Sequence, residues 1–458
     1  MEERDVVIIG GGPAGYRAAI RVSQLGGKTT LIETDTLGGT CINRGCIPVR
    51  AMLRSAEIVD LVRTAKDYGV DFKEAQIDIS RIISRKNIIV RTLVSGAKHP
   101  LGRNGVEVIE GTGKLLSPSQ IEIQLRDGSK KEVKARRIII ATGSRPKKVS
   151  IPGASNVITP AEAFELKVIP SSMLIIGGRF VGTSLATIFS KLGSNVCIVE
   201  ASPRILPEVD KEIVSLFEKE LENSKIQVHT ETRVRNVEEK GGEEKEIVLD
   251  VKGKETKFFA QYILVAEERE AGIEGLCLNE VGVKLNERGG IAVNGKMETN
   301  FPTILAAGDV TMQQMWTHVA YAEGIIAAEN AMGRDSRINY TAIPYGTNTI
   351  PEISGVGITE DEAIEKGYQI RVGRFSFSGN GFATILGQRA GMIKIITDGK
   401  YGQILGVHII GPHASDLIAE AALAVKLEIT IEEVSSVFHV HPTLSEVFWE
   451  AARSISDT

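Results

Sequence analysis

The chain of 458 residues has few cysteines and aromatic residues, no excess of basic charge and no long apolar run. Four cysteines in so long a chain are not the disulfide framework of a small secreted protein. The formal net charge of −4 shows no excess of basic residues, which argues against binding to nucleic acid. No uninterrupted apolar run approaches about 18 residues, so we expect no membrane span.

The start of the chain also lacks the features of a signal peptide. Charged residues 1–5 run directly into the apolar residues 6–9, without a basic n-region and a longer apolar h-region. We therefore expect a cytoplasmic protein, and in a reducing compartment a lone cysteine pair is more often catalytic than structural. The chain length predicts two to four domains, and 47 glycines with only 5% aromatic residues suit an enzyme built from many βα turns.

Cys41 and Cys46 lie in a Gly-rich segment, residues 38–48 (GGTCINRGCIP). On an ideal helix the Cα atoms of residues five apart are about 8.6 Å apart, whereas a disulfide needs roughly 4.4–6.8 Å. A disulfide here would therefore require a distorted turn or a loop, for which Gly45 supplies the freedom. One alternative, a pair of free core cysteines, conflicts with the polar surroundings. The other, a metal site, lacks ligands, because no His or Asp cluster stands nearby, and we predict no metal.

The segment before this pair has the pattern of a dinucleotide-binding unit. A strand, a helix and a second strand are expected over residues 6–9, 14–25 and 30–33. Between the first strand and the helix, GGGPAG fits the motif G-x-G-x-x-G. Gly10 would make the tight turn, Gly12 would let the backbone approach the pyrophosphate, and Gly15 would let helix and strand pack. Glu33 can hold a ribose hydroxyl, and the complete pattern is a strong dinucleotide signal.

A second, altered copy of this unit follows later in the chain. The pattern predicts a strand at 173–176, a helix reaching residue 192 and a strand at 196–200. Gly177 and Gly182 take the places of the first and third glycines, and Glu200 takes the place of the acid. The middle glycine is Arg179, which either blocks the pyrophosphate or pairs with a phosphate. The sequence leaves both alternatives open.

The remaining segments complete the predicted architecture. Buried strands lead into Ala141-Thr142-Gly143 and into Gly308-Asp309. After residue 344 the pattern changes to strands at 392–397 and 404–410 and a helix at 415–426, which indicates a separate α+β domain. We therefore predict an α/β protein with two Rossmann-like dinucleotide-binding domains and a C-terminal α+β domain. The expected limits are 1–148 and 271–343 for the two parts of the first dinucleotide-binding domain, 149–270 for the second and 344–458 for the C-terminal domain.

Together these segments resemble the FAD-dependent pyridine nucleotide–disulfide oxidoreductase family over nearly the whole chain. Residues 38–48 are similar to its redox-disulfide signature, and the first Gly motif with Glu33 matches its FAD fingerprint. Residues 141–144 and 308–309 match its two other flavin motifs, and residues 439–446 (HVHPTLSE) match the motif of its catalytic base. The lipoamide dehydrogenases of the family look most similar, because the chain lacks the C-terminal cysteines or redox tail of other members.

The resemblance implies four catalytic residues. Cys41 would be the interchange thiol that meets the substrate sulfur, and Cys46 the thiolate against the flavin. His441 would be the base and Glu446 would orient it, since only thiolates exchange with disulfides and a His takes protons near neutral pH. The implied flavin-binding residues are Gly10, Gly12, Pro13, Ala14, Gly15, Glu33, Gly39, Thr40, Arg50, Gly113, Ala141, Thr142, Gly143, Gly308 and Asp309. Those implied on the nicotinamide side are Gly177, Arg179, Gly182 and Glu200.

The resemblance also implies what each domain binds and which partners the protein has. The first dinucleotide-binding domain would be the FAD-binding domain, the second would be NAD-binding-like, and the C-terminal domain would be the dimerisation domain. In this family the base reaches the disulfide of the other subunit, so we expect a homodimer with a shared active site. The substrate would be a dihydrolipoyl group on a carrier protein, or a small dithiol or disulfide. Electrons would pass from the dithiol to Cys41–Cys46, then to FAD and then to NAD.

Four places depart from the family pattern, all on the nicotinamide side. Val49-Arg50 stands where lipoamide dehydrogenases usually have Ser-Lys, and Ser184 stands where they have the Glu that pairs with this Lys. Arg179 replaces the middle Gly, and Glu268 replaces a Gly before an Arg. We therefore predict that dithiol oxidation is retained while NAD binding is weakened or replaced by a ferredoxin, a quinone or another protein.

Two alternatives stand beside this prediction. In the first, Arg179 and Glu268 form a compensating pair and NAD still binds, with Glu200 favouring NAD over NADP. In the second, the protein is a non-catalytic or redox-sensing flavoprotein subunit of a larger complex, although a scaffold does not need the base His441.

Overall fold

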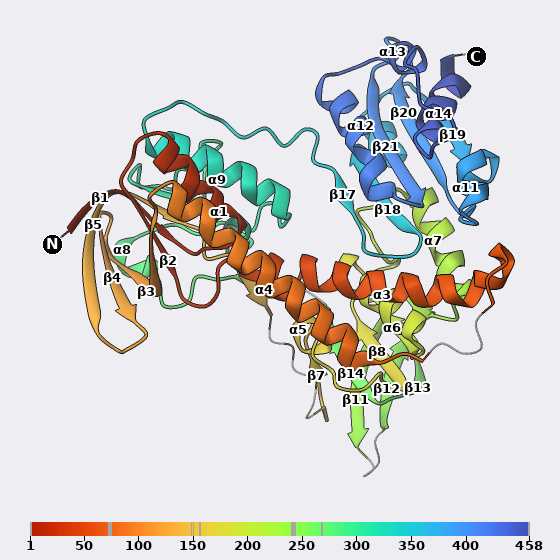
Figure 1. The fold of residues 1–458 in the computed structure, drawn as a ribbon, viewed down its shortest axis with the longest axis horizontal. Helices are drawn as coiled ribbons and strands as arrows, with labels where there is room; N and C mark the ends of the chain where they lie inside the picture. The colour runs from red at the N-terminus through yellow and green to blue at the C-terminus, as the bar shows by residue number, and fades with distance from the viewer. Residues whose placement is uncertain are drawn as a thin grey trace. The chain divides into compact units, whose positions relative to one another are not determined.

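The computed structural model describes residues 2–71, 76–147, 149, 151–154, 157–239, 244–266 and 269–456. The chain forms two compact units (Figure 1). The first unit contains Met1–Ala51, Ile83–Lys148 and Glu268–Asn339, and the second contains Met52–Ile82, Val149–Glu267 and Tyr340–Thr458. No helix among the described residues combines the length and the apolar character needed to cross a bilayer.

The first unit is built on a sheet with a parallel part and an antiparallel extension. Its parallel neighbours are, in order, β3 (Glu107–Ser117), β2 (Thr29–Glu33), β1 (Glu2–Ile9), β5 (Lys130–Ile140) and β16 (Ile304–Ala306). The outer parts of β3 and β5 also pair with β4 (Gln120–Leu125), which runs antiparallel to both. Residues 6–9 of β1 and all of β2 are buried, as expected of parallel strands covered on both faces.

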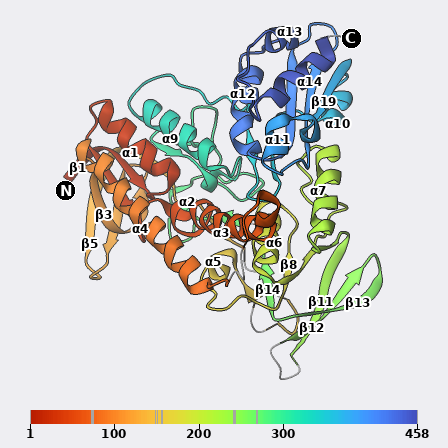
Figure 2. The ribbon, with the colours of Figure 1, turned by 45° about the vertical axis from the view of Figure 1, so that its right-hand side comes forward.

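Helices cover this sheet. Helices α1 (Pro13–Gln24) and α9 (Thr317–Ala331) pack against each other over one face, as Figures 1 and 2 show. The other short elements of this unit are α8 (Leu278–Val281), η2 (Asp309–Thr311) and a small antiparallel ladder of β6 (Ser144–Pro146) with β15 (Arg269–Ala271). Helix α4 (Ile79–Arg103) ends in this unit, where Leu101 joins the core beneath α1.

The second unit contains a parallel sheet with the same strand–turn–helix–strand beginning. Its strands are, in order, β10 (Gln227–His229), β9 (Asn195–Val199), β8 (Ser172–Ile176), β14 (Tyr262–Val265) and β7 (Val157–Ile158). Helices α5 (Pro160–Ala163), α6 (Phe180–Leu192) and α7 (Lys211–Asn223) accompany it. A meander of β11 (Thr232–Glu239), β12 (Lys245–Val251) and β13 (Lys254–Ala260) is added. The predicted internal duplication is therefore present in the fold.

The C-terminal part of the second unit is an antiparallel sheet with helices. Its strands are, in order, β17 (Tyr345–Gly346), β18 (Glu352–Gly357), β21 (Ile404–Gly411), β20 (Met392–Asp398) and β19 (Ile370–Ser376). The helices are α10 (Glu360–Glu365), η3 (Phe377–Gly379), α11 (Gly381–Ile385), α12 (Ala414–Lys426), α13 (Ile431–Ser435) and α14 (Glu446–Ser456). Apolar residues of α12 and α14 share one core with this sheet. The predicted fold class, with an α+β part at the C-terminus, is confirmed.

One buried ion cluster links the two parts of the second unit. Lys394 on β20 contacts both carboxylate oxygens of Asp210 at 3.0 Å and a carboxylate oxygen of Glu360 at 2.7 Å. The side chains of Lys394 and Asp210 are each only 2% exposed. Because an unpaired buried charge is costly, this contact strongly favours the observed packing of β20 against the start of α7.

Candidate active site

The two cysteines of the Gly-rich segment lie on either side of a break between helices. Helix α2 (Gly39–Arg44) ends before Gly45, whose backbone is non-helical (φ −136°, ψ −107°), and α3 (Cys46–Thr64) begins at Cys46. Both cysteines are free thiols in the structure. The segment is therefore not one regular helix, which confirms the distortion that the sequence predicted for a pair close enough to react.

The pair is electrostatically asymmetric. A hydrogen bond from the Cys41 thiol lowers the pKa of Cys46 to about 6, against the opposing effect of burial. The same hydrogen bond, together with burial, raises the pKa of Cys41. The hydroxyl of Thr317, 3.5 Å from the Cys46 sulfur, also lowers the pKa of Cys46, and the charge of Asp309 raises both. At neutral pH the reduced pair is thus a Cys46 thiolate beside a Cys41 thiol.

Thr317 is a functional residue that the sequence did not reveal. It is the first residue of α9 and lies 271 positions from Cys46 in the chain. No spacing or periodicity marks it, since its contact depends on how α9 packs beside the cysteine segment.

The first Gly motif has the shape of an anion-binding turn. Gly10 has a φ of +107°, and a Cβ there would lie 2.3 Å from the carbonyl oxygen of Ala141. A Cβ at Gly15 would lie 1.8 Å from the carbonyl oxygen of Gly10, so both positions require glycine. A Cβ at Gly12 would meet only Gly39, at 3.8 Å, and Gly12 begins α1 without a side-chain cap. The amide groups at this helix end therefore face a gap between glycines that suits phosphate.

Two further groups near this turn fit a dinucleotide. The buried carboxylate of Glu33, at the end of β2, accepts hydrogen bonds from the amides of Gly11 and Asp35, each at 2.7 Å. The hydroxyl of Thr142 is buried and has no hydrogen-bond partner among the residues that the structure describes. A buried orphan hydroxyl in a native fold needs a partner, which a bound polar group would supply. The residues of this unit therefore fit FAD.

The remaining residues predicted to bind the flavin also lie in the first unit. They are Pro13 and Ala14 at the start of α1, Thr40 in α2, Arg50 in α3, Gly113 in β3, and Gly143 and Gly308 in the turns after β5 and β16. Arg50 is half-buried and its neighbour Val49 is buried.

Asp309 belongs to a hydrogen-bond chain of three side chains. Ser144 lies at the start of β6, Arg269 at the start of β15, and Asp309 opens η2. Arg269 Nε lies 2.7 Å from Ser144 Oγ, which in turn lies 2.6 Å from Asp309 Oδ2. The sequence identified Asp309 as part of a flavin motif but gave no indication of this chain.

The second Gly motif keeps the glycines and the carboxylate contacts that shape its turn. Gly177 has a φ of +105°, and a Cβ at Gly182 would lie 1.8 Å from the carbonyl oxygen of Gly177, as in the first motif. The Glu200 carboxylate accepts hydrogen bonds from the amides of Gly178 (2.7 Å) and Ser202 (2.8 Å). Arg179 begins α6 with φ −87° and ψ −167°, close to the φ −72° and ψ −172° of Gly12. The difference between the two motifs is the side chain that Arg179 adds at the start of α6.

The side chain of Arg179 is paired within its own unit. Its guanidinium forms an ion pair with Glu208. Glu268, which the sequence suggested as its partner, lies outside the residues that the structure describes. Ser184, on α6, is buried, and its hydroxyl donates to the carbonyl of Phe180 at 2.6 Å. This hydroxyl also accepts a hydrogen bond from the amide of Asn348 at 3.3 Å, so it supports local structure.

The C-terminal motif distinguishes its two histidines. His441 is 79% exposed, and its Nδ1 lies 2.8 Å from Glu446 Oε1. His439 is only 7% exposed and lies 3.1 Å from a carboxylate oxygen of Glu420. The amide of Thr443 donates to the second oxygen of Glu446, and this bond and His441 lower the pKa of Glu446 against the opposing effect of burial. His441 is thus an accessible imidazole held by an ionised carboxylate.

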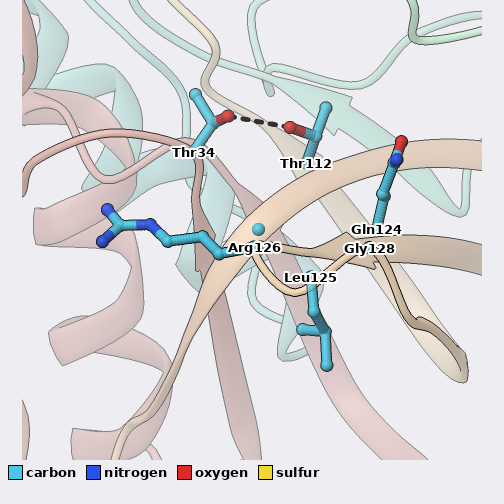
Figure 3. A pocket seen from close by; sticks show the side chains of 7 residues that line it. Thr34, Thr112, Gln124, Leu125, Arg126 and Gly128 are labelled. Carbon is cyan, nitrogen blue, oxygen red and sulfur yellow. Dashed lines mark hydrogen bonds between the residues drawn. The ribbon is translucent and has the colours of Figure 1, made fainter.

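The first unit also has an open pocket beyond the end of β2 (Figure 3). Its polar and apolar lining comprises Thr34, Gly111, Thr112, Gln124, Leu125, Arg126 and Gly128. Thr34 and Thr112 are joined by a hydrogen bond of 2.8 Å across it. Arg126 is held at the rim by Glu110 at 2.8 Å. None of the four candidate catalytic residues lines this pocket, so it is no part of the thiol chemistry.

Comparison with known proteins identifies the family. Residues 4–324 match the family described as pyridine nucleotide-disulphide oxidoreductase, and residues 343–452 match its dimerisation domain. The chain is 38% identical over 456 residues to a dihydrolipoyl dehydrogenase of Bacillus subtilis, with 98% of each protein covered. It is 36% identical over 463 residues to the leghemoglobin reductase of Glycine max, covering 100% of this chain and 88% of that protein.

A solved structure agrees with these sequence matches. LpdA from Mycobacterium tuberculosis has a TM-score of 0.91 and 26% identity, with 99% of each chain covered. Among the described residues, no group of three or more His, Cys, Asp or Glu side chains is arranged to hold a metal ion. The fold, the glycine turns and the cysteine pair agree with the sequence match, and the chain belongs to the pyridine nucleotide-disulphide oxidoreductase family.

Proposed function

We propose that this protein is a flavin-dependent oxidoreductase of the dihydrolipoyl dehydrogenase type that oxidises a protein-bound dihydrolipoyl dithiol. The observation that carries the proposal is the pair of free thiols on either side of the helix break at Gly45, where a hydrogen bond from Cys41 favours the thiolate of Cys46. The name of the Bacillus subtilis relative supports the same activity. A non-catalytic subunit is not favoured, because it would need neither this asymmetry nor the His441–Glu446 pair. A redox-sensing subunit would use a reactive thiolate but would not need the base His441.

The thiol chemistry is a pair of exchange steps. One thiolate of the substrate attacks the sulfur of Cys41 in the Cys41–Cys46 disulfide, and Cys46 leaves as a thiolate. The second thiolate of the substrate attacks the mixed disulfide, which closes the cyclic disulfide of the product and releases Cys41. The substrate loses two electrons and two protons, and the cysteine pair gains the two electrons. One proton remains on Cys41 and the other goes to a base.

His441 is the proposed base. An imidazole accepts protons near neutral pH, and the Glu446 carboxylate at Nδ1 leaves Nε2 as the accepting atom. The high exposure of His441 suits a base that serves a dithiol bound by another subunit. The match to the dimerisation domain supports a homodimer, and the fully exposed Phe438 and largely exposed Val440 beside His441 are apolar surface that an interface would bury.

FAD is the proposed resident cofactor of the first unit. Gly10, Gly12 and Gly39 would hold its pyrophosphate at the start of α1, and Glu33 and Asp309 would accept its hydroxyl groups. The chemistry that FAD supplies when bound is acceptance of two electrons from the reduced cysteine pair. The role of the protein is to keep Cys46 ionised and Cys41 protonated before that transfer.

We propose that the binding site for the electron acceptor differs from one in which the second Gly motif is intact. Arg179 places a side chain where the backbone would approach a pyrophosphate, and its ion pair with Glu208 holds it there. We infer weakened binding of NAD, with a protein, a quinone or a ferredoxin as the alternative acceptor. Micromolar binding of NAD⁺ in a calorimetric titration would refute it.

The domain limits, the lipoyl carrier and the location remain proposals of the same kind. We propose FAD-binding parts at 1–148 and 271–343, an NAD-binding-like domain at 149–270 and a dimerisation domain at 344–458. A cytoplasmic location stays a prediction.

The decisive experiment is anaerobic mixing of the yellow protein with dihydrolipoamide and, separately, with NADH. Reduction of the flavin by the dithiol, with a thiolate–flavin charge-transfer band, is the expected result. The Cys46→Ser variant is the control and should lose both responses. If the dithiol leaves the flavin oxidised, the proposed function is wrong. If NADH also reduces it rapidly, the acceptor is NAD and only the inference about the second motif fails.

A further inference from the structure

Arg269 directs two of its donor groups at one serine rather than at a carboxylate. Its Nε donates to the Ser144 hydroxyl at 2.7 Å, and its Nη2 donates to the Ser144 carbonyl at 2.6 Å. This two-point contact uses the planar fork of the guanidinium and fixes the side chain of Ser144. Burial lowers the pKa of Arg269, and the charge of Asp309 opposes that effect. The positive charge of Arg269 and the negative charge of Asp309 therefore interact electrostatically across Ser144.

The direction of the chain follows from the number of protons. A serine hydroxyl has one proton and two lone pairs. Because Arg269 can only donate, it occupies a lone pair of Ser144, and the single Ser144 proton is free to point at Asp309 Oδ2, 2.6 Å away. The three groups thus form a polarised series of hydrogen bonds that ends on the Asp309 carboxylate.

The backbone sets up this series before any ligand binds. In the ladder of β15 with β6, Ala271 lies opposite Ser144 and Arg269 lies opposite Pro146. One residue farther on, the Gly272 amide donates to the Gly143 carbonyl at 2.9 Å. A Cβ at Gly272 would lie 2.9 Å from the Thr142 carbonyl oxygen, so glycine permits this close approach. The serine and the arginine therefore meet through a fixed backbone contact rather than through flexible surface side chains.

The charge of Asp309 also affects the pKa values of the two cysteine thiols. It raises the pKa of both Cys41 and Cys46. Because opposite charges offset one another, we expect the Arg269 cation to reduce this effect of Asp309.

We propose that Arg269 is a positioning residue of the flavin site, which acts through the Ser144 hydroxyl to hold the Asp309 carboxylate in the orientation that accepts a hydroxyl of the flavin side chain. The inference rests on the proposed function, because it assumes that FAD binds to the first unit. It adds an arginine and a serine that touch neither the thiols nor the glycine turn.

The test compares the purified holoenzyme with Arg269→Met, Arg269→Lys, Ser144→Ala and the double variant Arg269→Met/Ser144→Ala. Arg145→Met is the matched control, because Arg145 lies on the same ladder but pairs with Glu270 at 2.8 Å at the surface. The measured quantities are the FAD dissociation constant and the pH midpoint of the charge-transfer band after reduction by dihydrolipoamide. Thermal unfolding of each apoprotein reports whether the fold is kept.

We expect Arg269→Met and Ser144→Ala each to weaken FAD binding by about tenfold. In the double variant the two losses should not add, because both changes break the same series. Arg269→Met should also raise the pH midpoint by roughly half to one unit. Arg269→Lys keeps the charge without the fork, so it should restore the pH midpoint more than the FAD affinity. Arg145→Met should match the wild type in both.

The proposal is overturned if Arg269→Met equals Arg145→Met in both measurements, or if its loss adds fully to that of Ser144→Ala. If Arg269→Met fails to fold, Ser144→Ala decides, because it removes one oxygen and unchanged FAD affinity would exclude the series. Failure of the proposed function looks different, since the wild type itself would then not bind FAD or would not be reduced by the dithiol.

Discussion

The hydrogen bond between the two active-site thiols gives the sharpest quantitative prediction. It is the largest contribution that lowers the pKa of Cys46 from an ordinary 9.0 to about 6, with burial acting in the opposite direction. Cys41→Ala removes the donor, whereas Cys41→Ser replaces the thiol by a hydroxyl that still donates. Each variant carries a single thiol at the site, so neither can form the Cys41–Cys46 disulfide, and Cys46 can be titrated directly.

The size of the effect follows from the two pKa values. At pH 7 a group with a pKa of about 6 is about 90% ionised, and one with a pKa near 9 is about 1% ionised. We therefore expect a titration midpoint near 6 for Cys41→Ser and a midpoint at least about two units higher for Cys41→Ala. A rate at one pH would understate the difference, because a thiolate of higher pKa is also more nucleophilic. The midpoint is therefore the quantity to compare.

The assay is the pH dependence of alkylation by iodoacetamide, with the modified residue identified by peptide mass. Cys197 serves as an internal control, because burial raises its pKa to about 12 and it should remain unmodified at neutral pH. Adding Thr317→Ala to the Cys41→Ser background should move the midpoint upward by a smaller amount, since the Thr317 contact is longer, at 3.5 Å. Equal midpoints for Cys41→Ser and Cys41→Ala would refute the reasoning.

Three further predictions concern the base, the second Gly motif and the buried ion pair. Glu446→Ala frees the ring of His441, so kcat/KM for dihydrolipoamide should fall by up to about 100-fold, and Glu446→Gln should cause a smaller loss. Equal activity of both variants and the wild type would contradict the role assigned to Glu446. Arg179→Gly should tighten NAD⁺ binding by about tenfold in calorimetry, because the backbone regains access to phosphate, and no change would show that Arg179 is not the obstacle. Lys394→Met leaves the buried Asp210 carboxylate without its cation and should cost about 3–5 kcal/mol in the free energy of unfolding measured with denaturant. Adding Asp210→Asn should recover much of that loss, and full persistence of the loss would exclude the ion pair as its cause.

Local pattern was sufficient for the elements that carry the glycine turns. Apolar runs followed by Gly motifs predicted β1, α1 and β2 and also β8, α6 and β9, and all six are present. The geometry explains why this worked. Gly10 and Gly15 in one motif, and their counterparts Gly177 and Gly182 in the other, are the positions where a Cβ would collide with backbone or would be strained. The fold itself therefore imposes these glycines on the sequence.

The middle position of each motif follows a different rule. Gly12 and Arg179 have nearly the same backbone conformation, and a Cβ at Gly12 would meet no close protein atom. The fold thus tolerates a side chain there, and the glycine is required only by what binds in front of the helix. This explains why the sequence indicated a changed ligand site without predicting a changed fold.

The sequence by itself determined the architecture, the glycine turns, the helix break at Gly45 and the segment that carries the base. Each depends on neighbours within a few residues or on a simple period, which a linear pattern records. Only the tertiary structure decided that Thr317 lies beside Cys46, that Arg269 lies beside Ser144 and that His441 rather than His439 is exposed. The first two contacts join residues 271 and 125 positions apart, and the exposure of a side chain depends on everything packed around it. No local pattern contains that information, because it arises only when distant segments are packed together.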